Sequence, residues 1–286
     1  MNAIDSHSIE TVQGTIAYIE TRLHERLDLE TAAKALGYSK YHLHRTFTSC
    51  AGQTPHSYIL RRRLTEAARR LVNTREPILE IALTSGYESQ RAFTAVFKTM
   101  YKRTPREYRE KGTYYPLQRP LTLNPNPAAP EAAQKITYAN QSDIPAWKDF
   151  IDVVIDGFPR LDEAEHMRRL KQRIEMRQVL ITRDGGAITG AAAYSERTGS
   201  IDFLAAHPQY RHYEIEKELL SYLKRSPLAG REISVTTFRM GDKADTGQRE
   251  RYRRLGFKEG AFLTEYGYPT QRLILRPEWE KSANER

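Results

Sequence analysis

Two runs of polar and basic side chains have the residue types that read DNA bases. They begin around Ser39 and Ser89, which lie 50 residues apart. The first run comprises Lys40, Tyr41, His44, Arg45 and Thr48, and the second comprises Ser89, Gln90, Arg91, Thr94 and Lys98. In a major groove Arg pairs bidentately with guanine and Gln with adenine. Each run therefore suits the outward face of a helix whose N-terminal half approaches base edges.

These runs belong to an internal repeat. The stretch GYSKYHLHRTFTSCAGQTPHSY from Gly37 and the stretch GYESQRAFTAVFKTMYKRTPREY from Gly86 share Ser, Phe, Thr-Pro and Tyr at matching places. In each copy an apolar-periodic helix ends at the glycine, and a serine follows where the next helix needs an N-cap. The pattern predicts two helix-turn-helix units. A solvated helix face is the alternative interpretation, which two tandem copies in a basic chain disfavour.

Apolar residues at helical spacing predict the elements that hold the two polar faces. The supporting helices have buried stripes formed by Leu29, Ala32, Ala33 and Leu36, and by Ile78, Ile81 and Ala82. The second helices are anchored by Leu43 and Phe47, and by Phe93, Val96 and Phe97. A helix is expected over residues 9–23, and a long connector helix from Pro55 to about Val72. The basic face of the connector, with Arg61, Arg62, Arg63, Arg69 and Arg70, could contact phosphates.

The charge is uneven along the 286 residues. The formal net charge is +9, and residues 1–112 hold 18 Lys+Arg against 12 Asp+Glu, whereas the remainder holds 27 against 24. The excess positive charge therefore lies mainly in the part that carries the repeat, which fits a polyanionic partner. Cys50 is the only cysteine, so an intramolecular disulfide is excluded. The absence of an apolar leader and of a long apolar run predicts a cytoplasmic protein that does not enter a membrane.

Residues 8–111 resemble the AraC/XylS family of bacterial transcription regulators, most densely in GYESQRAFTAVFKTMYKRTPREYR. The resemblance implies an all-α, homeodomain-like domain over residues 1–112. It also implies that Tyr41, His44 and Arg45 in one helix, and Gln90, Arg91 and Thr94 in the other, face the bases of double-stranded DNA. RNA polymerase is the protein partner that the resemblance implies.

The rest of the chain has a different pattern. Residues 113–134 contain five prolines and little periodicity, which predicts an extended linker. From residue 135 to 286, strand patterns alternate with helical ones, with helices expected over 146–158, 162–177 and 210–225 and Gly-rich turns after Asp184 and Thr198. This predicts an α+β domain on a mixed, largely antiparallel sheet.

The stretches IDFLAAHPQYRHYEIEKELLSYL and RYRRLGF resemble the GNAT acetyltransferases. The resemblance implies a loop that binds acetyl-coenzyme A, comprising Leu204, Ala205, Ala206, Arg211, His212, Glu214 and Glu216. In that family small residues stand at the places of Glu214 and Glu216, so that backbone N–H groups can approach the pyrophosphate. Two carboxylates there repel an anion, and we expect coenzyme A binding to be weak or lost.

Tyr252 matches the general-acid position of the same family, although a tyrosine before Leu-Gly-Phe equally suits packing. The eight histidines are scattered and lack cysteine partners, so no metal site is expected. The leading hypothesis is a sequence-specific regulator, expected to be an activator, whose second domain senses a small-molecule effector or contacts a protein. The alternatives are a bifunctional protein with an active acetyltransferase domain, and a second domain that only dimerises.

Overall fold

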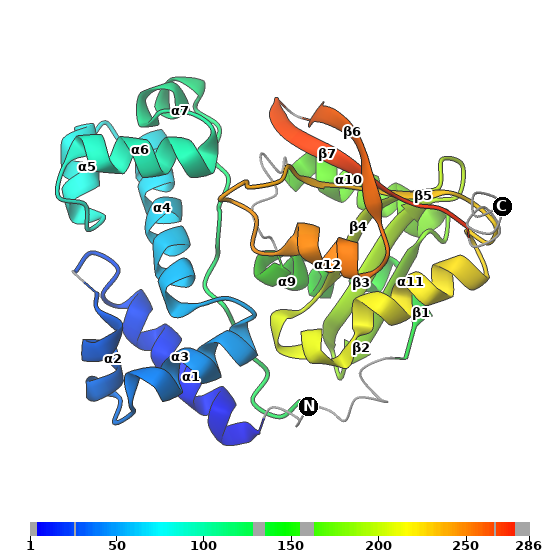
Figure 1. Ribbon diagram of the computed structural model, residues 1–286, viewed down its shortest axis with the longest axis horizontal. Helices are drawn as coiled ribbons and strands as arrows, with labels where there is room; N and C mark the ends of the chain where they lie inside the picture. Colours follow the sequence, from blue (N-terminus) through cyan, green and yellow to red (C-terminus); the bar gives the residue numbers. More distant parts are fainter. Residues whose placement is uncertain (1–4, 26, 128–134, 155–162, 266, 278–286) are drawn as a thin grey trace, which may run out of the picture. The chain divides into compact units, whose positions relative to one another are not determined.

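The computed structural model describes residues 5–25, 27–127, 135–154, 163–265 and 267–277 (Figure 1). These residues form two compact units, one ending at Pro127 and one that includes residues 135–154 and 163–277. Each unit has its own buried core. In the described ranges, every helix is too short or too polar to span a lipid bilayer.

The first unit is all-α. Its helices are α1 (Ser6–Glu20), α2 (Leu29–Ala35), α3 (Lys40–Ala51), α4 (Pro55–Asn73), α5 (Ile78–Thr84), α6 (Gln90–Tyr101) and α7 (Pro105–Lys111). Helix α4 packs against α3 towards one end and against α5 and α7 towards the other. It therefore joins a group formed by α1 to α3 with a group formed by α5 to α7 (Figure 1).

The repeat has the same local hydrogen bonds in both copies. After α2 the N–H of Tyr38 donates to Ala33 O, and after α5 the N–H of Tyr87 donates to Ala82 O, so both turns end their helix through a left-handed glycine. The side chains of Ser39 and Ser89 each accept a backbone N–H three residues on, at 3.2 Å. Both helix-turn-helix units predicted from the sequence are present.

Two of the five α4 arginines that the sequence suggested as phosphate contacts, Arg61 and Arg62, are buried instead. Arg61 and Arg62 are 1% and 5% exposed. Arg61 donates to Leu117 O at 2.9 Å, and Arg62 binds both carboxylate oxygens of Glu20 on α1 at 2.8 Å. Arg61 and Arg62 lie beside polar residues on α4, but α1 and the segment around Leu117 cover them. Buried guanidinium groups of this kind hold the unit together.

Residues 113–127 differ from the expected extended linker, since much of this segment packs along the first unit. Tyr115, Leu117, Leu121 and Leu123 are all buried. The backbone N–H groups of Leu117 and Leu121 donate to the side-chain oxygens of Thr65 and Tyr58 on α4. The prolines allow an extended path whose backbone groups bind side chains instead of a sheet. Residues 128–134, the remainder of the expected linker, lie outside the described residues.

The second unit has a mixed sheet in the order β1-β2-β3-β4-β5-β7-β6. Its strands are β1 (Thr137–Tyr138), β2 (Val179–Asp184), β3 (Ala187–Ser195), β4 (Ser200–Ala206), β5 (Ile233–Phe238), β6 (Lys258–Glu265) and β7 (Tyr268–Leu275). Its helical segments are η1 (Gln141–Asp143), α9 (Ile144–Val154), α10 (Glu163–Glu175), η2 (Pro208–Tyr213), α11 (Ile215–Arg225) and α12 (Gln248–Arg254). The β4–β5 pair is parallel, whereas the other neighbouring strands are antiparallel.

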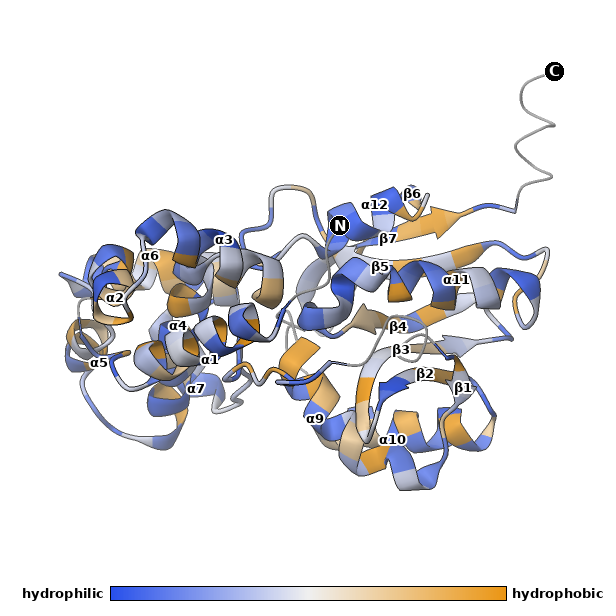
Figure 2. Ribbon diagram, turned by 90° about the horizontal axis from the view of Figure 1, so that it is seen from below, coloured by the Kyte–Doolittle hydropathy of each residue, from blue (hydrophilic) through white to orange (hydrophobic). Residues whose placement is uncertain are grey.

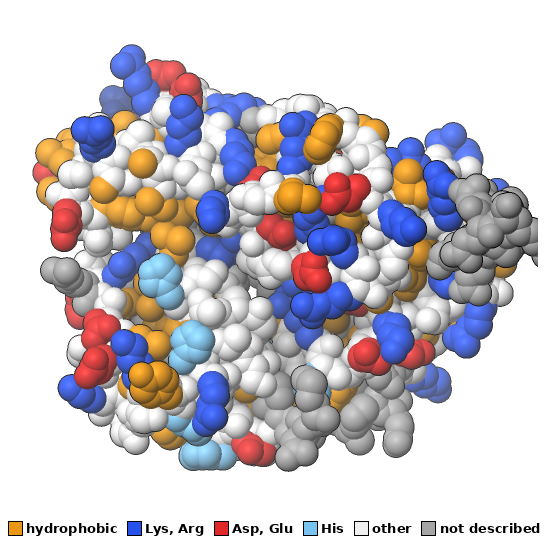
Figure 3. Space-filling model, viewed as in Figure 1, with side chains coloured by type: hydrophobic (Ala, Val, Ile, Leu, Met, Phe, Trp, Pro, Cys, Tyr) orange, Lys and Arg blue, Asp and Glu red, His pale blue; other side chains and the backbone are white. Residues whose placement is uncertain are grey.

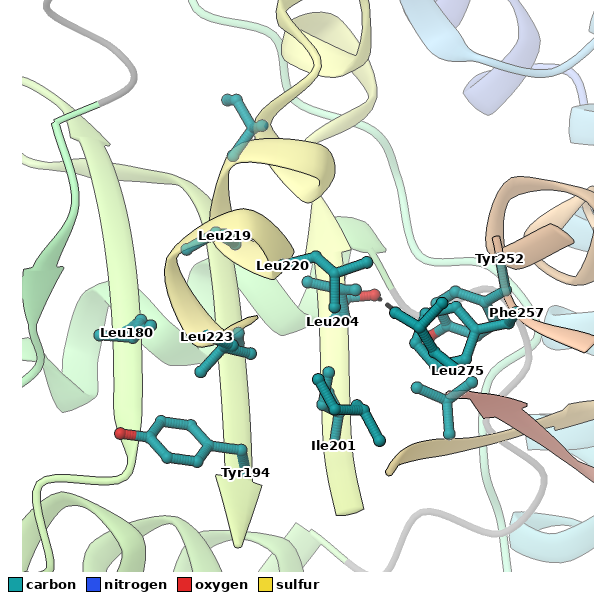
Figure 4. Close-up of a cluster of buried hydrophobic side chains, with 14 of the residues drawn as sticks. Leu180, Tyr194, Ile201, Leu204, Leu219, Leu220, Leu223, Tyr252, Phe257 and Leu275 are labelled. Carbon is teal, nitrogen blue, oxygen red and sulfur yellow. Dashed lines mark hydrogen bonds between the residues drawn. The ribbon is translucent and has the colours of Figure 1, made fainter. Parts of the chain in front are cut away.

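Helices cover both faces of this sheet, as Figure 2 shows. On one face Leu219, Leu220 and Leu223 of α11 pack with strand residues such as Leu204 and with Tyr252 of α12 (Figure 4). On the other face Trp147 and Phe150 of α9 pack on Phe203 of β4, with ring centroids 5.5 and 6.1 Å apart. Successive side chains of β4 point to opposite faces of the sheet, so Leu204 packs under α11 and Phe203 packs under α9.

Two expected helices in this unit have different bounds. The helix expected over 210–225 begins only at Ile215, because residues 208–213 form η2 and Glu214 has a left-handed backbone with φ 55°. The helix expected over 146–158 is observed over Ile144–Val154, and residues 155–158 lie outside the described residues.

We predict that Arg62→Met destabilises the first unit by about 3 kcal/mol, because it leaves the Glu20 carboxylate without its buried partner. Urea unfolding followed by far-UV circular dichroism measures this difference. The control is Arg69→Met on the same helix, where the side chain is 54% exposed and pairs with Glu66; about 0.5 kcal/mol or less is expected. Equal losses in the two variants would contradict a structural role for the buried pair.

Candidate nucleic-acid interface

The side chains expected to face DNA lie on the outward faces of α3 and α6. Leu43 and Phe47 fix α3, and Phe93 and Phe97 fix α6, and all four are 0% exposed. The remaining faces of these helices point to solvent because an apolar i, i+4 pair buries only one side of a helix. None of the ten expected residues is buried.

On α3 the outward residues form one polar surface. Lys40, His44 and Arg45 are exposed, Thr48 is half-buried, and Tyr41 is 82% exposed. An aromatic ring left this open in the first turn of a helix has no packing role in the unit, which leaves it available to a partner. The Thr48 hydroxyl donates to His44 O at 2.7 Å, so its oxygen remains an acceptor.

On α6 the outward surface is formed by Gln90, Arg91, Thr94 and Lys98, of which only Thr94 is half-buried. Ser89 has a different role from the other four, since its hydroxyl oxygen accepts the Ala92 N–H and caps the helix. The sequence had pointed to Ser89 as a DNA-facing residue without its counterpart Ser39, although the two serines form the same cap.

Both helices favour anions. Neither α3 nor α6 contains an aspartate or glutamate, and both begin with a capped, solvent-exposed first turn. The N-terminus of a helix carries partial positive charge, which here adds to the outward cations. Figure 3 shows Lys and Arg side chains over α6 and α7 and histidines over the neighbouring part of the first unit. The arrangement suits contact with phosphates on either side of a groove.

The loop expected to bind acetyl-coenzyme A lies at the end of β4 in the second unit. Leu204, Ala205 and Ala206 are buried in that strand, and η2 carries Arg211 and His212, both half-buried. Burial lowers the pKa of His212. Strands β4 and β5 pair only through Ser200 with Ser234 and Ile201 with Val235, at the start of both strands.

Glu214 and Glu216 lie at the N-terminus of α11. Glu214 has a left-handed backbone and an exposed side chain that binds Lys217 at 2.9 Å. Glu216 points inward, where its side chain is 14% exposed and lies 3.7 Å from the Arg251 guanidinium of α12. A carboxylate in the first turn of α11 interacts favourably with the helix dipole. The helix N-terminus is therefore already neutralised by the chain's own charge.

Tyr252 is 3% exposed and lies between α12 and β4. Its hydroxyl donates to Leu204 O at 3.3 Å, drawn as a dashed line in Figure 4, and accepts from Gln248 Nε2 at 3.1 Å. Burial raises the pKa of Tyr252, and the nearby Glu216 raises it further. The phenol is thus a neutral hydrogen-bond donor to a strand carbonyl, an arrangement that serves packing and leaves a proton near the end of β4.

Comparison with known proteins gives relatives mainly for the first unit. A family model described as a helix-turn-helix domain matches residues 32–111. The regulatory protein SoxS of Escherichia coli is 41% identical over 100 residues, which are 35% of this chain and 94% of that protein.

Two solved structures are each similar to part of this chain. The crystal structure of a transcriptional regulator with an AraC-type DNA-binding domain from Chromobacterium violaceum is 28% identical. The match covers 38% of this chain and 96% of the Chromobacterium violaceum chain, with a TM-score of 0.35. An acetyltransferase of the GNAT family from Bacillus cereus is 16% identical and covers 50% of this chain and 96% of that chain, with a TM-score of 0.39.

We predict that Glu214→Gly stabilises the second unit by about 1 kcal/mol, because glycine adopts the left-handed conformation without a Cβ clash. The lost pair with Lys217 is exposed and contributes little. Thermal and urea unfolding measure the change. Glu218→Gly, inside α11, is the control and is expected to destabilise by about 1 kcal/mol. Destabilisation by Glu214→Gly would show that its carboxylate matters more than its backbone.

Proposed function

The chain belongs to the AraC family of helix-turn-helix regulators through its first unit, and on that basis we propose that it binds specific DNA sequences with α3 and α6. The observation that carries the proposal is the pair of capped, carboxylate-free helices whose outward faces hold the expected side chains. Two such helices on one connector suit two successive major-groove segments about 10 bp apart.

The outward side chains divide into two kinds. Arg45, Gln90 and Arg91 can form bidentate hydrogen bonds with base edges, Arg with guanine and Gln with adenine. Lys40 and Lys98 supply charge to phosphates, and the hydroxyls of Thr48 and Thr94 can accept or donate. Tyr41 and His44 add the contacts that distinguish the first helix from the second. The two helices therefore read different base sequences despite their common origin.

For the second unit we propose a GNAT-like domain that no longer binds acetyl-coenzyme A. The left-handed Glu214 supports this fold, since it stands where the resemblance expects glycine and has the backbone that glycine favours. The inward Glu216, with Arg251 beside it, supports loss of pyrophosphate binding. We infer that the unit senses an effector or contacts a protein. We also propose that the protein activates transcription by contacting RNA polymerase, as its resemblance to the AraC/XylS family implies.

A second candidate is an active N-acetyltransferase joined to the DNA-binding unit. The observation that favours it is Tyr252, whose phenol stays protonated and lies on the Leu204 carbonyl near the end of β4. In that reaction Tyr252 would protonate the thiolate of coenzyme A as it leaves the acetyl group. The residues at the N-terminus of α11 oppose this candidate, because they place a carboxylate where a pyrophosphate would bind.

We predict that Arg45→Ala and Arg91→Ala each lower affinity for a selected DNA site by about 1–3 kcal/mol and relax specificity at one base position. The site is first selected from random duplexes, and affinity is then measured by fluorescence anisotropy at physiological salt. Arg69→Ala, on the exposed face of α4, is the control and should leave specificity unchanged. Failure of the wild-type protein to select any sequence would refute the proposal.

We predict that calorimetric titration with acetyl-coenzyme A gives no binding heat up to about millimolar ligand, because Glu216 occupies the helix N-terminus. The double variant Glu214→Gly with Glu216→Ala restores small residues at both places and should gain measurable affinity. Micromolar binding by the wild-type protein would instead favour the acetyltransferase candidate. Turnover of amine substrates with acetyl-coenzyme A then becomes the deciding assay.

A further inference from the structure

Arg63 connects the two helix-turn-helix groups of the first unit. It lies on α4 directly after Arg62, which binds Glu20 of α1. The part of α4 that follows packs on the second group, formed by α5 to α7. Its Nε donates to Leu23 O at 2.9 Å, and its Nη2 donates to Glu25 O. Both carbonyls belong to the turn that follows α1, in the first group.

The same guanidinium lies against the turn of the second group. A Cβ added to Gly86 would stand 2.9 Å from Cζ and Nη1 of Arg63, so the glycine backbone is close to the planar group. The next residue, Tyr87, packs its ring on Phe93 of α6 with centroids 5.3 Å apart. Contacts thus run from the turn after α1, through Arg63, to the helix that carries Gln90 and Arg91.

The repeat itself offers a contrast. Gly37 is the counterpart of Gly86 and has a similar left-handed backbone, with φ 76° against 84°. A Cβ added to Gly37 would meet nothing within 4 Å. The first turn therefore needs glycine for its backbone alone, whereas the second turn needs it also because Arg63 occupies the adjoining space.

We propose that Arg63 is a positioning residue that sets the separation and angle of α3 and α6, and with them the spacing between the two DNA segments that the protein accepts. The inference rests on the proposed DNA-binding function and adds a determinant that touches no base. A guanidinium suits the task because its planar fork binds two carbonyls of one turn while its face packs on a backbone.

Spacing discrimination tests the proposal. Wild-type protein is titrated with its selected site and with duplexes that have one base pair added or removed between the two segments. One base pair shifts the segments by about 3.4 Å and about 34°, so we expect the wild type to lose about tenfold or more in affinity. Arg63→Met should lower this discrimination at least about fivefold, since its α6 is less tightly held. Arg69→Met removes the same charge from the exposed face and should retain the discrimination.

Two further measurements keep the test decisive if Arg63→Met folds poorly. Gly86→Ala displaces the guanidinium without removing it, whereas Gly37→Ala has the same backbone strain with open space beside it, so only the former should relax spacing. Spin labels at the exposed positions Ser49 and Thr99, with Cys50→Ala, report the α3–α6 distance without DNA. We expect a broader distance distribution in Arg63→Met and in Gly86→Ala, and an unchanged one in Gly37→Ala.

If the wild-type protein selects no site, both the proposed function and this inference are overturned. If the wild type discriminates spacing and Arg63→Met keeps the same ratio and the same label distances, only the role of Arg63 is overturned.

Discussion

The first unit depends on where α4 places three adjacent guanidinium groups. Arg61, Arg62 and Arg63 point to different neighbours, namely the chain after α7, the Glu20 carboxylate and the turn after α1. A charged group taken from water needs such partners, because an unpaired buried charge is strongly destabilising. This requirement constrains the arrangement of the helices, because each arginine reaches its partners only when α1 and the chain after α7 lie in the observed positions relative to α4. Two small helix-turn-helix groups are thereby held on one helix.

The two copies of the repeat show which features a recognition unit must keep. The serine caps, the left-handed glycines and the buried phenylalanines are common to both, because each satisfies a local demand of the helix-turn-helix backbone. The outward residues are free of those demands and differ between α3 and α6. Under the proposed function, this divergence of the exposed faces would let one chain read two unlike DNA segments.

In the second unit, the chain's own charged side chains lie at the N-terminus of α11. Glu214 precedes α11 with a left-handed backbone, and Glu216 in the first turn forms an ion pair with Arg251 of α12. Tyr252 remains on the strand carbonyl and packs with Phe257 in the core of the unit (Figure 4). Packing alone is sufficient to account for that tyrosine.

The amino-acid sequence alone determined the features that act within a few residues: the repeat, its caps and turns, the buried and outward faces of α3 and α6, and the alternating pattern of the second unit. Helical periodicity and capping depend on neighbours one turn away, so the sequence displays them directly. Only the tertiary structure decided that Arg61 and Arg62 are buried and that residues 115–123 pack on the first unit. It also decided that Arg63 joins two turns and that Glu216 faces Arg251. These partners lie tens of residues apart in the chain, and their meeting depends on its path through space, which no local pattern encodes.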